Sequence, residues 1–485
     1  MLGFSRHWIN EDQTLLWHAA RDLGAGRILQ PSFYGQAYLT TFEALPAEVL
    51  RWFGVPLWTG VPIATAALVV GPWLAVAAAA WHRRRSGAAA AALALPVVMR
   101  TEFLVSVESP GGRGAGIAAA MVGTALVVAW PDRVRSVAAG LGLLALGVVW
   151  NPTSLVLAAA VGAWVLVEHR SRRVVLEAAV ASLPAAAWFA WAQLFVRARP
   201  DHDIHRGASF APDLTVLRAT LGDIGRYVDV AAPELARSWL VVAAATAAVF
   251  ALAIASRRAA PVAAVAGVVG GLAVMLAAPK ALDGTGSPWL SFGRYVHLLP
   301  VALWFVVTVT VEPRRRSLGL AAVGAAVVVS AATFTVRAVT FDERTSAIAA
   351  IGRATAGAPV TPVAETLARC DTIDDLDVPV VVFRYDRTGA YACGALAYDR
   401  QRTLFPAYDR RTWLLHDEST RRRTAFAFTE ADGEVCARLP AEASAIVMCD
   451  AGGRIGIVRG ENLDVLSTWR AAGEDVREFE QPERP

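Results

Sequence analysis

Apolar residues in this chain are gathered in long blocks separated by short polar loops. Each block has roughly 16 to 25 residues, which is the length that about 30 Å of hydrocarbon requires of a helix. The pattern therefore predicts about ten membrane-spanning helices, and with them a polytopic α-helical membrane protein. The predicted spans are 57–81, 87–107, 115–130, 136–150, 154–167, 174–196, 239–256, 262–278, 295–311 and 317–336.

Two of these blocks have distinctive sequences. The blocks 136–150 and 154–167 give the weakest prediction, because they meet at Asn151-Pro152 and are expected to form a broken or partly interfacial pair. In the block 262–278, Gly267, Gly270 and Gly271 are expected to allow close packing between helices.

Composition agrees with a membrane location. Hydrophobic residues make up 55% of the 485 residues and charged residues only 18%. A soluble protein of this length could not cover so much apolar surface with so few charged residues. The net charge of +4 arises from short basic loops, and no motif indicates nucleic-acid binding.

The basic loops predict the orientation. Every second loop carries an arginine cluster, and arginine and lysine are retained on the cytoplasmic side. The intervening loops and both termini are then exocytoplasmic, which places the chain in the cytoplasmic (inner) membrane. The arginine clusters lie at 83–85, 133–135, 170–173, 257–258 and 314–316.

Composition also divides the chain into regions. We expect an external loop with two juxtamembrane helices at 1–56, a transmembrane domain at 57–337, an exocytoplasmic soluble domain at 338–472 and a disordered tail at 473–485. The soluble domain is predicted to be a small α/β or α+β unit. Its expected elements are a helix at 346–368 and strands at 378–383, 425–428, 445–448 and 455–458.

All four cysteines lie in this predicted soluble domain, at Cys370, Cys393, Cys436 and Cys449. An even number of cysteines in an exported domain indicates disulfides, and three pairings are open. The alternative is four unpaired buried thiols on the cytoplasmic side.

The segment 1–56 contains no stretch that could cross a bilayer, although the loop pattern places it outside. Residues 1–10 also lack the features of a signal peptide. We therefore expect that the intact protein has one more helix before this segment, which would give about eleven spans. Two amphipathic helices at 12–23 and 36–52 are expected to lie along the membrane interface with their apolar sides down.

This segment resembles the first external loop of bacterial membrane glycosyltransferases of the GT-C superfamily, including those similar to dolichyl-phosphate-mannose mannosyltransferases. The residues that carry the resemblance are Asn10-Glu11-Asp12-Gln13-Thr14-Leu15-Leu16-Trp17, Gly26, Pro31, Phe33-Tyr34-Gly35-Gln36-Ala37-Tyr38 and Glu43-Ala44. The resemblance implies an inverting transfer of a sugar from a polyprenyl-phosphate donor to a glycan, lipid or protein acceptor at the outer face.

The resemblance implies that Asp12 is the catalytic base, with Glu11 beside it. It also implies that Glu43 is a structural or acceptor-facing acid. A second reading of Asn10-Glu11-Asp12-Gln13 is a helix start. In that reading Asn10 caps the helix, Gln13 completes a capping box, and the acids favour the helix dipole.

Further candidates lie in later loops. Arg100 and Glu102 interrupt the second span, and since residues two apart on a helix point to different sides, each needs another partner. Glu102 is interpreted as an acceptor or metal ligand, or else as an interfacial residue. Arg294 and Tyr295, with Lys280, are the candidates for binding the donor phosphate, and interfacial anchoring is the alternative.

No cofactor is predicted with certainty, and a divalent metal is left open. His202, Asp203 and His205 have a spacing that could bind a metal, but histidines in a polar loop are more often simply solvated. The rival functions are a transporter or flippase of a lipid-linked saccharide, and a non-catalytic membrane scaffold. A transporter is expected to bury polar groups near the midplane in broken helices, whereas the ionisable residues here gather at the outer boundary.

Overall fold

The computed structural model describes most of the chain. Its described residues are 7–101, 104, 110–199, 212–229, 231–278, 296–311, 316–354, 360–374, 380–383, 387–396, 403–406, 422–429, 446–449 and 455–464.

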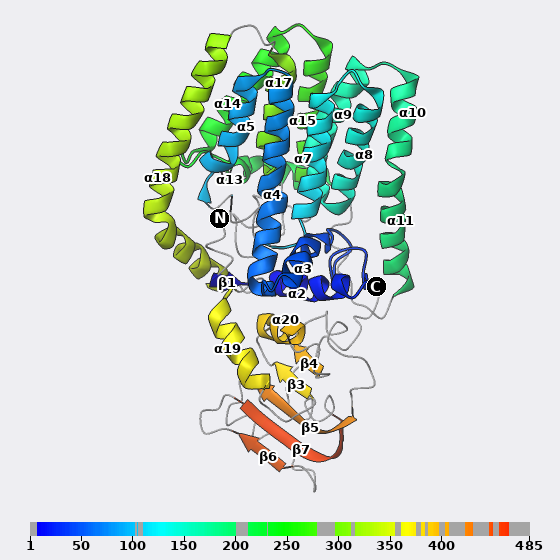
Figure 1. Cartoon of the computed structure of the whole chain (residues 1–485), viewed down its shortest axis with the longest axis vertical. Coiled ribbons are helices and arrows are strands. Elements are labelled where there is room, and N and C mark those ends of the chain that lie inside the picture. The colour runs from blue at the N-terminus through cyan, green and yellow to red at the C-terminus, as the bar shows by residue number, and fades with distance from the viewer. Residues whose placement is uncertain are drawn as a thin grey trace.

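A bundle of apolar helices makes up one part of the molecule, and a small β-sheet lies beyond one end of it (Figure 1). The bundle helices are α4 (Leu57–His82), α5 (Ser86–Val98), α7 (Gly114–Ala129), α8 (Val134–Trp150), α9 (Leu155–Glu168), α10 (Arg172–Ala181), α11 (Leu183–Ala198), α12 (Leu214–Gly222), α13 (Ile224–Asp229), α14 (Trp239–Ala255), α15 (Ala259–Leu276), α17 (Leu299–Thr310) and α18 (Arg316–Ala354).

Three helices of the described chain are long and apolar enough to cross a membrane, namely α4, α15 and the part Val323–Ala350 of α18. The helices α10 and α11 would form a fourth span together, but they are bent by 41°. The other apolar helices have 10 to 17 residues. The predicted span 174–196 is therefore not a single helix. It breaks at Ser182, because Pro184 in the first turn of α11 has no N–H to continue the ladder of hydrogen bonds.

Glycines decide how closely some of these helices pack. Gly271 of α15 lies against α9, where a Cβ atom would come within 2.8 Å of the Val156 backbone, and Gly267 meets the backbone of Ala159 in the same way. Close packing is therefore confirmed for Gly267 and Gly271. It is wrong for Gly270, where a Cβ atom would have no atom within 4 Å.

The helices α8 and α9 run in opposite directions and are joined by the 3-10 turn η2 (Pro152–Ser154), which starts at the predicted break. Asn151 caps this turn through its side-chain oxygen, which accepts a hydrogen bond from the Thr153 N–H at 3.3 Å. Asn151 is only 1% exposed, so the break is a buried corner of the bundle.

The C-terminal strands form one five-stranded sheet in the order β4-β3-β5-β7-β6. Strand β3 pairs in parallel with β4 and β5, whereas β7 pairs antiparallel with β5 and β6. The strands expected at 378–383, 425–428, 445–448 and 455–458 are present, and β4 and the helix α20 (Arg387–Leu396) were not anticipated. The strands are β3 (Val380–Phe383), β4 (Thr403–Pro406), β5 (Arg422–Thr429), β6 (Ile446–Cys449) and β7 (Ile455–Asp464).

The predicted boundary at 337/338 falls inside α18, which continues without a break from Arg316 to Ala354. The single helix expected at 346–368 is wrong, because α18 ends at Ala354 and a separate helix α19 (Val363–Asp374) follows. A disulfide between Cys370 and Cys393 joins α19 to α20. Only one of the three open pairings includes this bond.

The first external segment connects the bundle with the C-terminal part. Helix α2 (Glu11–Gly24) lies across the end of the bundle, and α20 lies on its far side (Figure 1). His18 contacts the Tyr391 carbonyl oxygen through Nε2 at 2.8 Å, and strand β1 (Trp8–Ile9) pairs with β2 (Thr361–Pro362). Helix α2 therefore does not lie free on a membrane interface as predicted, because protein covers both of its sides.

The second juxtamembrane helix starts later than the predicted residue 36. It consists of the 3-10 turn η1 (Phe42–Ala44) and α3 (Leu45–Trp52). The preceding loop is held by the buried Gln30 side chain, whose amide group donates to the carbonyl oxygens of Phe33 and Gln36 at 3.0 and 2.7 Å. Because Gln36 is tied into this loop, it cannot begin a helix.

Candidate functional site

The helical bundle has two chemically different ends (Figure 1). The arginine end carries the loops that contain Arg83, Arg133, Arg170 and Arg257, and the α2 end carries α2, α3 and the C-terminal sheet. The predicted site residues that the structure describes are Glu11, Asp12 and Glu43, and all of them lie in the segment at the α2 end.

Glu11 and Asp12 form the first turn of α2 and are both partly exposed. The cap of this helix is made by their neighbours: Asn10 Oδ1 accepts from the Gln13 N–H at 3.1 Å, and Gln13 Oε1 accepts from the Asn10 N–H at 3.0 Å. The capping box predicted for Asn10 and Gln13 is confirmed. Neither carboxylate is part of the box.

Glu43 is fully buried where η1, α4 and α7 meet. Its Oε2 accepts from the Gly114 N–H at 2.9 Å, and its Oε1 accepts from the Thr65 hydroxyl. Burial raises the pKa of Glu43, while the hydrogen bonds from Thr65 and Gly114 and the charge of Arg113 oppose the rise. The carboxyl lies at the N-terminus of α7, where backbone N–H groups favour an anion. This geometry is that of a structural acid.

The loop before α7 is packed against the first external segment. Gly112 has a φ of +78°, which favours glycine, and a Cβ atom there would come within 2.7 Å of the Thr40 carbonyl oxygen. The Thr40 N–H donates to the Gly112 carbonyl oxygen at 3.4 Å. The two external segments are thereby held together beside Glu43.

Arg100 follows the end of α5 inside the predicted second span 87–107, and it has a partner other than Glu102. Its guanidinium forms an ion pair with Asp229, at the end of α13. The prediction that Arg100 contacts a group other than Glu102 is confirmed for this residue.

A larger network lies next to this pair and was missed by sequence reasoning. The side chain of Glu234 is fully buried and accepts from Arg237 Nη2 at 2.7 Å, from the Thr101 N–H at 2.9 Å, and from Arg344 of α18. Burial raises the pKa of Glu234, but the hydrogen bonds from Arg237, Arg344 and Thr101 outweigh burial and lower it to about 2. The one signal in the sequence is the spacing of three between Glu234 and Arg237.

Tyr34 and Gly35, two residues that carry the GT-C resemblance, have structural partners here. The Tyr34 hydroxyl donates to Asp22 Oδ2 at 2.7 Å, and the Gly35 N–H donates to Gln30 Oε1 at 3.0 Å. Burial raises the pKa of Asp22, and the hydrogen bond from Tyr34 and the charge of Arg27 oppose the rise. These contacts fix the loop after α2 and hold it against that helix.

The remaining candidates, Glu102, Lys280, Arg294 and Tyr295, lie outside the described residues, as do His202, Asp203 and His205. Within the described ranges, no group of three or more histidine, cysteine, aspartate or glutamate residues could hold a metal ion.

Comparison with models of known protein families, with curated proteins and with solved structures finds no match to this chain. Its function is therefore inferred from the residues and their placement.

Proposed function

We propose that this chain is a membrane glycosyltransferase of the GT-C type, which moves a sugar from a polyprenyl-phosphate donor to an acceptor at the outer face of the cytoplasmic membrane. In this proposal the membrane contains about ten spans of the chain, and the C-terminal sheet is exocytoplasmic. The acceptor is a glycan, a lipid or a protein.

The observation that carries the proposal is the position of Asp12. It lies in the partly exposed first turn of a helix that crosses one end of the apolar bundle, and the capping box beside it is complete without it. Sugar transfer needs a base for the acceptor hydroxyl and a cation for the leaving phosphate. Asp12 is assigned the first task and Arg294 the second, with Tyr295 and Lys280 beside it. Glu43 is assigned a structural role because it is fully buried.

Charge placement favours a transferase over a transporter. The helices α4, α5, α7, α14, α15 and α17 contain no aspartate, glutamate, lysine or arginine. A transporter would be expected to hold its substrate with polar groups near the membrane midplane. One observation favours a transporter instead. The chain is bent between α10 and α11, and broken helices are typical of transporters.

The test uses the purified chain in lipid bilayers with a panel of polyprenyl-phosphate sugars. Asp12→Asn should lower turnover by about 100- to 10,000-fold, which is the usual contribution of a general base. The matched control is Asp132→Asn, which makes the same change at the arginine end, where Asp132 is 86% exposed. Equal turnover by Asp12→Asn and the native chain would remove Asp12 from the mechanism. Absence of turnover with every donor, together with movement of a labelled lipid-linked saccharide across the bilayer, would favour the transporter.

A further inference from the structure

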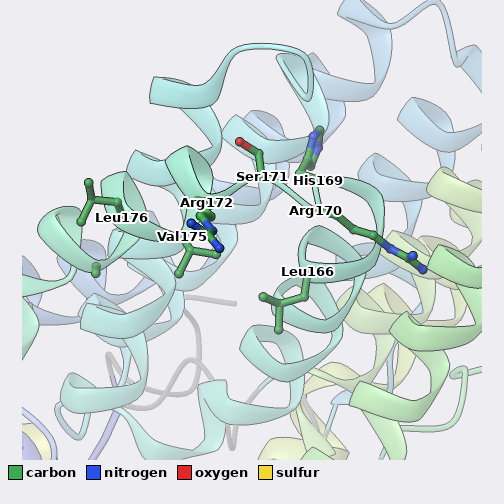
Figure 2. Close-up of a pocket in the computed structure, with 8 residues that line it drawn as sticks. Leu166, His169, Arg170, Ser171, Arg172, Val175 and Leu176 are labelled. Atoms are coloured by element: carbon green, nitrogen blue, oxygen red, sulfur yellow. The ribbon is translucent and has the colours of Figure 1, made fainter.

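A pocket of about 520 Å³ lies at the arginine end, where the chain turns from α9 into α10. One part of its lining is polar and comes from consecutive residues of the turn, His169, Arg170, Ser171 and Arg172. Figure 2 shows that the Arg170 and Arg172 side chains extend to either side of Leu166. A group held at this turn would therefore have a cation on each flank.

The other part of the lining is apolar and faces outward. It consists of Leu166 of α9 and Val175, Leu176 and Ala179 of α10. Leu166 is 64% exposed and Leu176 is 67% exposed, although both are large apolar side chains. Helix α10 lies at the edge of the bundle, so these side chains face the medium that surrounds the bundle (Figure 1). An exposed apolar wall of this kind fits a hydrocarbon chain.

Arg170 and Arg172 differ from the neighbouring Arg173 in their contacts with carboxylates. Arg173 forms an ion pair with Glu177 at 2.8 Å, one turn along α10. Among the residues that the structure describes, neither Arg170 nor Arg172 has an ion pair with a carboxylate. Orientation in the membrane accounts for arginines in this loop, but it does not account for a pocket that joins them to an apolar wall.

His169 is held in place beside the two arginines. Its ring makes an edge contact with Trp164, with the ring centroids 5.6 Å apart, and Trp164 is 6% exposed. Its Nε2 is buried without a hydrogen-bond partner within the described part of the chain. The His169 ring is thus packed against a buried tryptophan at the turn that carries both cations.

We propose that this pocket binds one anionic phospholipid, with the phosphate between Arg170 and Arg172 and an acyl chain along Leu166, Val175 and Leu176. A guanidinium group matches a phosphate in charge and geometry. The apolar wall requires a ligand that carries a hydrocarbon chain, which a soluble phosphate lacks. The site lies at the end of the bundle opposite α2 and is independent of the proposed transfer chemistry.

The test is native mass spectrometry of the full chain in neutral detergent, titrated with phosphatidylglycerol, with phosphatidylcholine or with inorganic phosphate. The native chain should retain one phosphatidylglycerol. Substituting Arg170→Gln together with Arg172→Gln should weaken that binding on the order of 30-fold, since each arginine near an anionic lipid surface contributes about fivefold. Ala179→Trp, which fills the apolar part of the pocket without changing the charge, should also release the lipid.

The matched control is Arg133→Gln with Arg135→Gln, because these two arginines have the same spacing and lie at the start of another helix, α8, at the arginine end. The control should retain the phosphatidylglycerol. Equal loss in the control would show a general charge effect and overturn the proposal. Binding of phosphatidylcholine as tight as that of phosphatidylglycerol would overturn the role of the arginines, and displacement by inorganic phosphate would overturn the role of the apolar wall. A thermal unfolding transition like that of the native chain, measured on each variant in neutral detergent, separates lost binding from lost folding.

Discussion

The two ends of the helical bundle carry charged residues in opposite ways. At the arginine end the charges are exposed, and the pair of Arg83 and Asp132 is loose at 3.6 Å with Asp132 86% exposed. Glu43 at the α2 end and Glu234 between α13 and α14 are instead buried, and each accepts hydrogen bonds from elements distant in sequence. Exposed charges of the first kind contribute little to folding, whereas a buried charge must have its partners. Charged residues are therefore exposed at the arginine end, whereas the two buried glutamates hold distant parts of the chain together.

The two buried glutamates also differ from each other in the direction of their pKa shifts. Burial disfavours the charged form of both, but the pKa of Glu234 is lowered to about 2 and the pKa of Glu43 is raised. The difference lies in the partners, because Glu234 contacts two arginines directly while Glu43 accepts from a hydroxyl and a backbone N–H. Hydrogen bonds from a hydroxyl and a backbone N–H thus offset the effect of burial on the pKa less than two arginines do.

The largest effect is expected for Glu234→Gln. Removing this carboxylate leaves Arg237 and Arg344 close together without their anion, and the loss of one partner of a buried ion pair costs about 3 to 5 kcal/mol. The free energy of unfolding in mixed detergent micelles measures this cost. The control Asp132→Asn should change it by less than about 1 kcal/mol, as is typical of exposed pairs. Similar costs for the two variants would contradict the contrast between buried and exposed charges.

A somewhat smaller loss of stability is expected when the pH is lowered, because His18 lies at the contact between α2 and α20. Burial lowers the pKa of His18 from 6.5 to about 4, although its hydrogen bond to Tyr391 opposes this. The unfolded chain binds the proton first, so stability present above pH 6.5 is lost as pH falls toward about 4. The full loss is about 3 kcal/mol, from about 1.4 kcal/mol per pKa unit.

The variant His18→Gln isolates this titration. A glutamine amide can still donate to the Tyr391 carbonyl oxygen, but it does not titrate. Thermal unfolding of the variant should therefore no longer show the loss of stability that His18 causes as pH falls from 6.5 to about 4. An unchanged dependence in the variant would assign the acid effect to other groups. Asp22 cannot mimic it, because its raised pKa makes stability increase as pH falls.

The smallest effect is expected for Glu43→Gln. The glutamine oxygen can accept from the Gly114 N–H and its NH2 group can donate to the Thr65 hydroxyl oxygen, so the exchange should cost only about 1 kcal/mol. Because the raised pKa of Glu43 makes native stability fall as pH rises above 4.5, the variant should also remove that decline. Unfolding measured at two pH values checks both statements. A cost as large as that of Glu234→Gln would show that Glu43 acts as a paired charge.

Several features could be predicted from the sequence because they are local. The apolar blocks predicted helices, Asn10 and Gln13 predicted the capping box, and Asn151-Pro152 predicted the turn between α8 and α9. Hydrophobic length, caps and proline act within a few residues, so the pattern along the chain is sufficient for them.

The partners of the candidate site could not be predicted in this way. The sequence indicated that Arg100 needs a partner, but Asp229 lies 129 positions away, and the bond from Arg344 to Glu234 spans 110 positions. Glu43 could be named as an acid of the first external loop. Its burial against Thr65 and α7 became evident only from the packing.

The sequence by itself determined that the chain folds into apolar helices with arginine loops between them, because helix length and local charge are properties of consecutive residues. Tertiary structure alone decided that α2 is enclosed by α4 and α20, that Gln30 delays the start of the second juxtamembrane helix, and that Cys370 is joined to Cys393. These features depend on which distant surfaces meet when the chain packs, and no local pattern specifies that meeting.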